Sequence, residues 1–254
     1  MCFCKWKIQV FRTADALRSV LVLVLVSFSG LTSAGCLEDY KEVIDGLYKE
    51  SSVVRSRTVC KVWPATGNLI VAASIERAEN IDLDVQLFDF ATNSVIGRVR
   101  ELGVLTGDAI YNSGIVIDTA KYRLDEASLA FGIRISWNGA SRANPYSSES
   151  LRLYISKGSE LVTPLSGLTT YEYSGEWDTR CVGSFVTRKM TLVIRPRAGS
   201  YADLLVKEKV EGAILRGTES DCKDAVTERV LTTVVLRYEQ DSYEVPERLR
   251  TLAW

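Results

Sequence analysis

Short segments in which hydrophobic and polar residues alternate occupy most of the chain. The alternation is regular over 82–87 and 129–137, and it places every second side chain on the buried face of a β-strand. A helical period of apolar residues occurs over 37–47, before the strands begin. Further strands are predicted over 69–75, 95–100, 109–117, 151–155, 190–194, 202–209, 213–216, 231–238 and 242–245.

Many short strands separated by turn residues are typical of a sandwich or a barrel. The pattern contains no strand–helix–strand alternation, which argues against a nucleotide-binding α/β fold. Two segments also resemble each other, because 58–60 (Thr-Val-Cys) and 179–181 (Thr-Arg-Cys) are each followed, 22 residues after the cysteine, by Asp-Leu-x-Val. We therefore predict a mainly β fold with two related antiparallel β-sandwich-like modules, preceded by one short N-terminal helix. A chance coincidence of short strand patterns is the alternative explanation of the repeat.

The predicted organisation has five parts. Residues 1–34 are a signal peptide, 35–55 an N-terminal helix and linker, 56–158 a first β-module, 159–175 a linker, and 176–254 a second, smaller β-module. The boundary between the modules is placed where Pro164 and several glycines interrupt the apolar pattern.

The first segment has the pattern of an export signal. Lys5, Lys7, Arg12 and Arg18 precede the apolar run 20–26, and small residues follow just before Cys36. The run is well short of the roughly 20 residues that span a bilayer. Three outcomes follow from this pattern: cleavage after Ala34, lipidation of Cys36 as in a bacterial lipoprotein, or an anchor that is never cut.

The remaining cysteines fit an oxidising compartment. They are not spaced as C-x-x-C, so zinc ribbons and thioredoxin-like chemistry are not indicated. We predict a disulfide between Cys181 and Cys222, which both belong to the second half of the chain. Cys60 then pairs with Cys36, or stays free if Cys36 is lipidated. Because Asn-x-Ser/Thr sequons are also absent, we expect an exported protein in the periplasm or at the outer-membrane periphery of a bacterium.

The composition excludes several chemistries. The chain has 0 histidines, which removes Ser-His-Asp and Cys-His catalytic sites and histidine-ligated zinc. The net charge is −1, and the sequence contains no basic patch. We therefore do not expect nucleic acid as a partner. A calcium site at Asp82 and Asp84 is the metal alternative. The second repeat has Leu205 where Asp84 would fall, so we favour strand capping and expect neither a metal nor a cofactor.

One stretch of the first module resembles a known family. The segment Asp82–Asp89, followed by a turn and Val95–Arg98, is similar to the opening strands of bacterial pre-peptidase C-terminal domains. The resemblance covers about residues 66–156, and the chain lacks the protease domain that accompanies such modules. It implies a secreted β-sandwich with a ligand face, and it carries over no catalytic residue.

Two polar and aromatic segments are candidate ligand surfaces. The candidate residues are Trp137, Asn138, Arg142, Asn144 and Tyr146 of one loop and Trp177 of another, because aromatic rings beside amide and guanidinium donors suit sugars or peptides. The alternative is that these aromatics fill the ends of the sandwich. We thus expect a non-catalytic envelope protein, periplasmic or lipid-anchored, that binds a protein or glycan partner or supports an assembly. It would contact the membrane only through a lipid at Cys36. The alternative is an envelope hydrolase that uses a pair of carboxylates.

Overall fold

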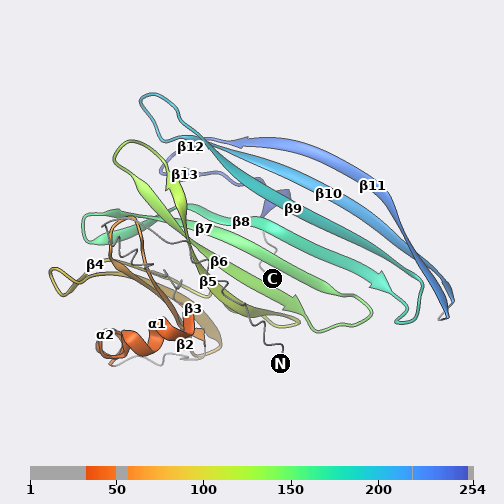
Figure 1. The fold of residues 1–254 in the computed structure, drawn as a ribbon, viewed down its shortest axis with the longest axis horizontal. Helices are drawn as coiled ribbons and strands as arrows, with labels where there is room; N and C mark the ends of the chain where they lie inside the picture. Colours follow the sequence, from red (N-terminus) through yellow and green to blue (C-terminus); the bar gives the residue numbers. More distant parts are fainter. Residues whose placement is uncertain (1–32, 50–56, 219, 251–254) are drawn as a thin grey trace, which may run out of the picture. The chain divides into compact units, whose positions relative to one another are not determined.

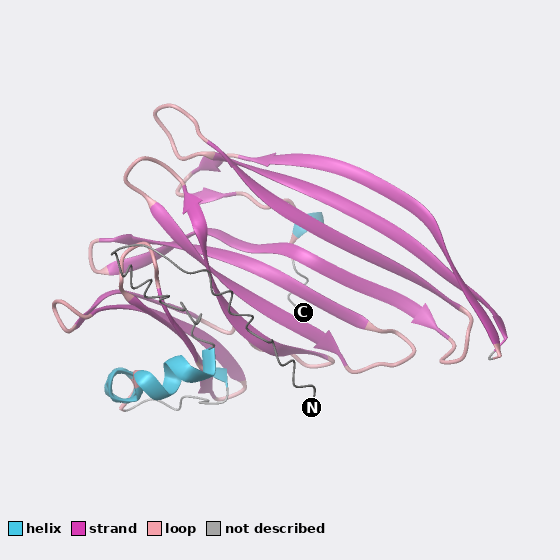
Figure 2. Ribbon diagram, in the orientation of Figure 1, coloured by secondary structure: helices cyan, strands magenta, loops and turns pink. Residues whose placement is uncertain are grey.

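A computed structural model describes residues 33–49, 57–218 and 220–250. These residues are mainly β, as predicted, with two helices at the N-terminal end (Figures 1 and 2). Almost all of the predicted signal peptide, and the end of the chain from residue 251, lie outside the described residues. Within the described ranges, no helix has the length and apolar character needed to cross a membrane.

The predicted N-terminal helix is two helices, α1 (Ser33–Asp39) and α2 (Lys41–Leu47). The helical pattern is confirmed, but the backbone leaves helical geometry at Tyr40, where φ is −114° and ψ is 25°. The apolar side of the pair, including Ile44 and Tyr48, packs on the outer face of the first strands together with Leu69 and Val71. The helices therefore cover the outer face of these first strands.

In the described part of the chain, eleven strands form one sheet and two short strands form a second sheet. The large sheet contains β1 (Val59–Val62), β2 (Leu69–Arg77), β3 (Asn80–Asp89), β4 (Ser94–Glu101), β5 (Ile110–Arg123), β6 (Leu129–Gly139), β7 (Tyr146–Lys157), β8 (Glu160–Trp177), β9 (Gly183–Arg195), β10 (Asp203–Thr218) and β11 (Asp221–Leu236); the small sheet pairs β12 (Tyr238–Glu239) with β13 (Ser242–Tyr243).

Strand β8 joins the two halves of the chain. It pairs along its length with β7, at its start with β4, and over Tyr171–Trp177 with β9. The range 159–175, expected to be a linker, is thus almost entirely strand, and the two predicted modules continue into each other. Pro164 and Gly167 fit into β8 because the β7–β8 register shifts there, with two residues of β7 opposite three of β8.

The first core lies inside the curled part of the sheet. The strand order in this part is β1-β2-β3-β4-β8-β7-β6-β5. The edge strands β1 and β5 approach each other where Lys61 Nζ donates to Ile117 O at 3.5 Å. The alternating residues predicted to be buried are buried, including Leu83, Val85 and Ile133. Their inward direction follows directly from the period of two along each strand.

A second core lies where β9 leaves β8. Leu151 and Leu153 of β7 pack with Leu204 of β10 and with the C-terminal segment 243–249. A short 3₁₀ turn, η2 (Glu247–Leu249), buries Leu249 there, and Arg250 bridges to Leu168 of β8. The C-terminal segment therefore lies beside the part of β8 that is not paired with β9.

Both predicted disulfide pairings are present. Cys181 is bonded to Cys222 with a Cα–Cα distance of 5.5 Å, and Cys36 is bonded to Cys60 with a Cα–Cα distance of 5.8 Å. The Cys181–Cys222 bond confirms the pairing predicted within the second half of the chain. The Cys36–Cys60 bond is one of the two alternatives that the sequence left open for Cys36. Two structural disulfides are typical of proteins in an oxidising, exported environment.

The repeated sequence pattern corresponds to two hairpins, β2–β3 and β9–β10. In each, the shared aspartate accepts from an arginine: Asp82 from Arg77 at 3.0 Å and Asp203 from Arg195 at 2.5 Å. The repeated cysteines differ in setting, because Cys60 lies within β1 whereas Cys181 lies in the turn before β9.

Candidate functional site

A groove of about 1000 Å³ lies between loops that are far apart in the sequence. It is lined by the β5–β6 turn (Arg123–Ala127), the β9–β10 loop (Pro196–Ala202) and Tyr238 of β12. We call it the tyrosine groove, because Tyr201 and Tyr238 are its two aromatic residues and both are half-buried. It therefore combines elements from both halves of the chain.

The two loops of the tyrosine groove are tied together by a backbone hydrogen bond. Ala202 N–H donates to Leu124 O at 2.6 Å, and both residues are buried. The hydroxyls of Ser128 and Tyr201 lie 3.3 Å apart and add a second link. Gly199 has a φ of +69°, which a residue with a Cβ rarely adopts, so the loop needs glycine there. These contacts hold the walls of the groove in place.

Three tyrosines pack together at the aromatic side of the groove, and two of them, Tyr201 and Tyr238, line it. The rings of Tyr201 and Tyr238 lie 4.4 Å apart at 50°, and Tyr243 meets Tyr238 at 5.3 Å and 64°. Tyr243 is buried and donates its hydroxyl to Ala202 O at 2.7 Å. Burial, followed by the neighbouring Tyr238, raises the pKa of Tyr243, so its hydroxyl stays protonated at physiological pH. Tyr243 thus supports the two rings that line the groove.

Three of the four charged side chains that line the groove have defined partners. Arg123 donates to Glu126 O at 3.0 Å, and Arg197 lies 3.8 Å from Asp203. Asp125 accepts the N–H groups of Ala127 and Ser128. Burial alone would raise the pKa of Asp125, but the hydrogen bonds from Ser128 outweigh it and lower the pKa. Asp125 is therefore a turn-forming carboxylate that is ionised at neutral pH.

This arrangement suits non-covalent binding of a polar ligand. Tyrosine rings offer an apolar face beside a hydroxyl, and the exposed guanidinium of Arg197 offers donors for hydroxyl or acidic groups. The groove shares tyrosine and arginine with the loops that were predicted to bind a ligand. A sugar ring or an extended peptide can lie against such a surface.

Two of the predicted site residues meet in a different place. Asn144 and Trp177 line a hollow of about 470 Å³ together with Asp178, Val182 and Leu215. We call this the tryptophan hollow. It forms because Trp177 N–H donates to Ala143 O at 2.7 Å, which attaches the β6–β7 loop to the end of β8.

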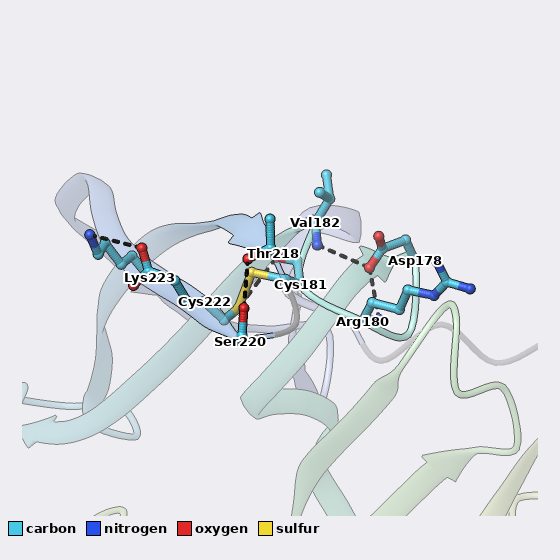
Figure 3. The surroundings of a disulfide bond; sticks show 9 residues. Asp178, Arg180, Cys181, Val182, Thr218, Ser220, Cys222 and Lys223 are labelled. Carbon is cyan, nitrogen blue, oxygen red and sulfur yellow. Dashed lines mark hydrogen bonds and ion pairs between the residues drawn. A yellow bond between two sulfur atoms is a disulfide. The ribbon is translucent and has the colours of Figure 1, made fainter.

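The tryptophan hollow lies next to the Cys181–Cys222 disulfide. Figure 3 shows Asp178 turned toward the backbone of the same turn, where its Oδ1 accepts from Arg180 N and Val182 N at 2.9 Å each. The hydrogen bond from Arg180 N–H is the main cause that lowers the pKa of Asp178. Asp178 is thus occupied in forming the turn that presents Cys181.

The other predicted site residues are not brought together with Trp177. Trp137 packs partly against the first core, and Asn138 lies within β6, opposite Ser147. Arg142 is exposed in the β6–β7 loop, and Tyr146 is half-buried at the start of β7, where burial raises its pKa. The alternation along β6 and β7 separates these side chains, because neighbours in sequence point to opposite faces.

Asp82 and Asp84, which are the alternative calcium ligands in the sequence, form ion pairs with arginines instead. Asp84 is fully buried, and its Oδ2 accepts from Arg98 Nη2 at 2.8 Å and from Arg100 Nε at 2.9 Å. Its other oxygen accepts from Tyr48 and Gln86. The described residues contain no cluster of three or more acidic, cysteine or histidine side chains that could hold a metal.

The sequence pattern did not lead to a prediction of the tyrosine groove. Its signal is the loop Pro196-Arg197-Ala198-Gly199-Ser200-Tyr201, which has turn residues, an arginine and an aromatic in one stretch. The loop of Trp137–Tyr146 has the same features, so residue types alone do not separate the two. Comparison with protein families, curated proteins and solved structures finds no match for this chain.

Proposed function

We propose that this protein is an exported, non-catalytic binding protein of the bacterial envelope, and that the tyrosine groove holds a glycan. The observation that carries the proposal is the pair of half-buried rings of Tyr201 and Tyr238, 4.4 Å apart, beside the exposed Arg197. Adjacent aromatic rings with nearby donors favour a ligand that has both apolar faces and many hydroxyl groups.

Binding is favoured over hydrolysis because Asp125, one of the two carboxylates that line the groove, is engaged in forming its own turn. A glycosidase of the usual kind needs one carboxylic acid with a raised pKa. The carboxylate of Asp125 in the groove has a lowered pKa and holds a turn. Away from the groove, Glu208 is held by Arg188 and Arg248, and its pKa is about 2.

Export is supported by the two disulfides and by the signal-like pattern before Cys36. A disulfide at Cys36 also favours the non-lipidated form, because a lipid on Cys36 would occupy the same sulfur. Intact mass of the chain from periplasmic and membrane fractions tests this. We expect a chain that begins near Gly35 and gains four protons on reduction. A diacylated or triacylated Cys36 in the membrane fraction would contradict it.

The binding function is tested with two soluble probes, an oligosaccharide of N-acetylglucosamine and a mixture of peptidoglycan fragments. Calorimetric titration of the exported chain is expected to show saturable binding to at least one. Tyr201→Ala should weaken it by about tenfold or more, equivalent to about 1.4 kcal/mol. Tyr111→Ala is the matched control, because Tyr111 is 46% exposed on β5 and does not line the groove.

Three results would contradict parts of this proposal. Loss of binding in Asn144→Ala, with Tyr201→Ala unaffected, would move the ligand to the tryptophan hollow. Release of new reducing ends from the oligosaccharide would identify a hydrolase. Failure of both probes to bind would remove glycans as the ligand class.

A further inference from the structure

Strand β11 is a long edge of the large sheet. Among the described residues it pairs with β10 only, so one row of its backbone N–H and C=O groups faces away from the sheet. Its last seven residues, Val230–Leu236, are Val-Leu-Thr-Thr-Val-Val-Leu, without charge, glycine or proline. Uncharged β-branched segments of this kind on an exposed edge readily pair with another strand.

The two parts of β11 differ in how they are protected. The first part carries Lys223, Asp224 and Arg229, and the β10–β11 register shifts at Gly212/Ala213. Charges and bulges are the usual means by which an edge resists pairing. The segment Val230–Leu236 carries neither feature, although Leu231 is 73% and Val235 is 41% exposed. Pairing is therefore confined to about 24 Å of strand, at roughly 3.4 Å per residue.

An apolar row crosses the outer face of the sheet and ends at this edge. Val193 of β9 lies opposite Leu205 of β10, and Leu205 lies opposite Val235 of β11. Val193 and Val235 are 37% and 41% exposed. A further apolar side chain beyond Val235 would continue the row and cover part of it.

We propose that a second copy of this chain supplies that side chain, through antiparallel β11–β11 pairing about a two-fold axis at Thr233. With Thr233 opposite Thr233, Leu231 lies opposite Val235 of the second copy, and Val230 lies opposite Leu236. All of these pairs join residues of the same face, as antiparallel pairing about a two-fold axis requires. The row then runs Val193, Leu205, Val235 and on to Leu231 of the second copy.

Charge limits the pairing at both ends of the segment. The next pair outward would be Arg229 with Arg237 of the second copy. The two arginines would repel each other. Arg229 already forms an ion pair with Glu211 Oε1 of its own subunit at 2.8 Å, and this pair offsets much of the repulsion. Other registers lose the match: a two-fold at Thr232 would place Leu231 opposite Thr233 and Val235 opposite Arg229.

The oligomeric state tests the proposal. Sedimentation velocity of the exported chain at about 0.1 mM should show a dimer, since a micromolar Kd gives nearly complete association at that concentration. Leu231→Lys should convert it to a monomer. Val226→Lys is the matched control, because Val226 is 64% exposed on the same strand but outside the paired segment, and it should leave the dimer intact. A monomeric wild type, or a dimer that Leu231→Lys leaves unchanged, would overturn the proposal.

A cysteine at the two-fold axis tests the register. Directly opposed residues of antiparallel strands have Cα atoms about 4.5–5.5 Å apart, which is within the range of a disulfide. Thr233→Cys should therefore form a covalent dimer under mild oxidation, and Val226→Cys should not. Equal cross-linking of both variants, or no cross-linking of Thr233→Cys in a protein that is dimeric, would refute this pairing. Neither variant touches the tyrosine groove, so the result is independent of glycan binding.

Discussion

Removal of the Asp84 carboxylate should destabilise the first half of the sheet. Asp84 is fully buried on β3 and accepts hydrogen bonds from four side chains, two of them arginines. Asp84→Ala leaves those donors without their acceptor. Breaking a buried ion pair costs about 3–5 kcal/mol. The low end applies here, because the Arg98 and Arg100 side chains are 44% and 34% exposed and can turn to water.

The loss for the two neutral donors adds to this. Tyr48 and Gln86 are 8% and 1% exposed, so their polar groups reach water poorly once Asp84 is gone. We expect a total of about 3–4 kcal/mol. For a domain of this length the loss corresponds to a fall in Tm of about 10 °C.

Urea unfolding followed by tryptophan fluorescence measures the effect. The midpoint should fall while the m-value stays constant, which separates a stability change from a change in the folded state. Asp221→Ala is the control, because its carboxylate is 71% exposed and pairs with the exposed Lys223; it should change stability by less than about 0.5 kcal/mol.

Two results would refute this reasoning. A loss below about 1 kcal/mol for Asp84→Ala would mean that the buried network contributes little. Destabilisation of the wild type by a chelator would mean that Asp84 holds a cation rather than the two arginines. We expect the chelator to leave the midpoint unchanged.

Two further predictions concern the second half of the chain. The double variant Cys181→Ser/Cys222→Ser opens a loop of 41 residues and should lose about 4 kcal/mol by the chain-entropy relation, measured by urea unfolding; equal stability of the oxidised wild type and the variant would contradict it. Glu208 is the pH-sensitive group: burial would raise its pKa, but hydrogen bonds from Arg188, Arg248 and Thr232 lower it from 4.5 to about 2. Its contribution, about 3 kcal/mol at most, is therefore complete above the unfolded pKa and is lost as the pH falls from about 5 to 2. Glu208→Gln should flatten the stability profile in that window, and an unchanged profile would show that other groups cause the acid loss.

The sequence alone determined the class of fold and much of the chemistry. Alternation along 82–87 and 129–137 identified buried strand faces correctly, because the period of two is a local property of extended backbone. The pairing of Cys181 with Cys222 was also predicted, since both cysteines belong to the same half of the chain. The absence of histidine excludes imidazole chemistry whatever the fold, because no arrangement of the chain can supply a side chain that it lacks.

Tertiary structure alone decided how the halves join and where the groove lies. Glycines and Pro164 in 159–175 are typical of a linker, yet bulges let β8 run through them and pair with both β7 and β9. The tyrosine groove combines Arg123–Ala127, Pro196–Ala202 and Tyr238, which are separated by many residues. Local periodicity assigns a side chain to a face, but which loops meet at the end of a sheet depends on strand order. That order is set by non-local pairing, which no single stretch of the sequence encodes.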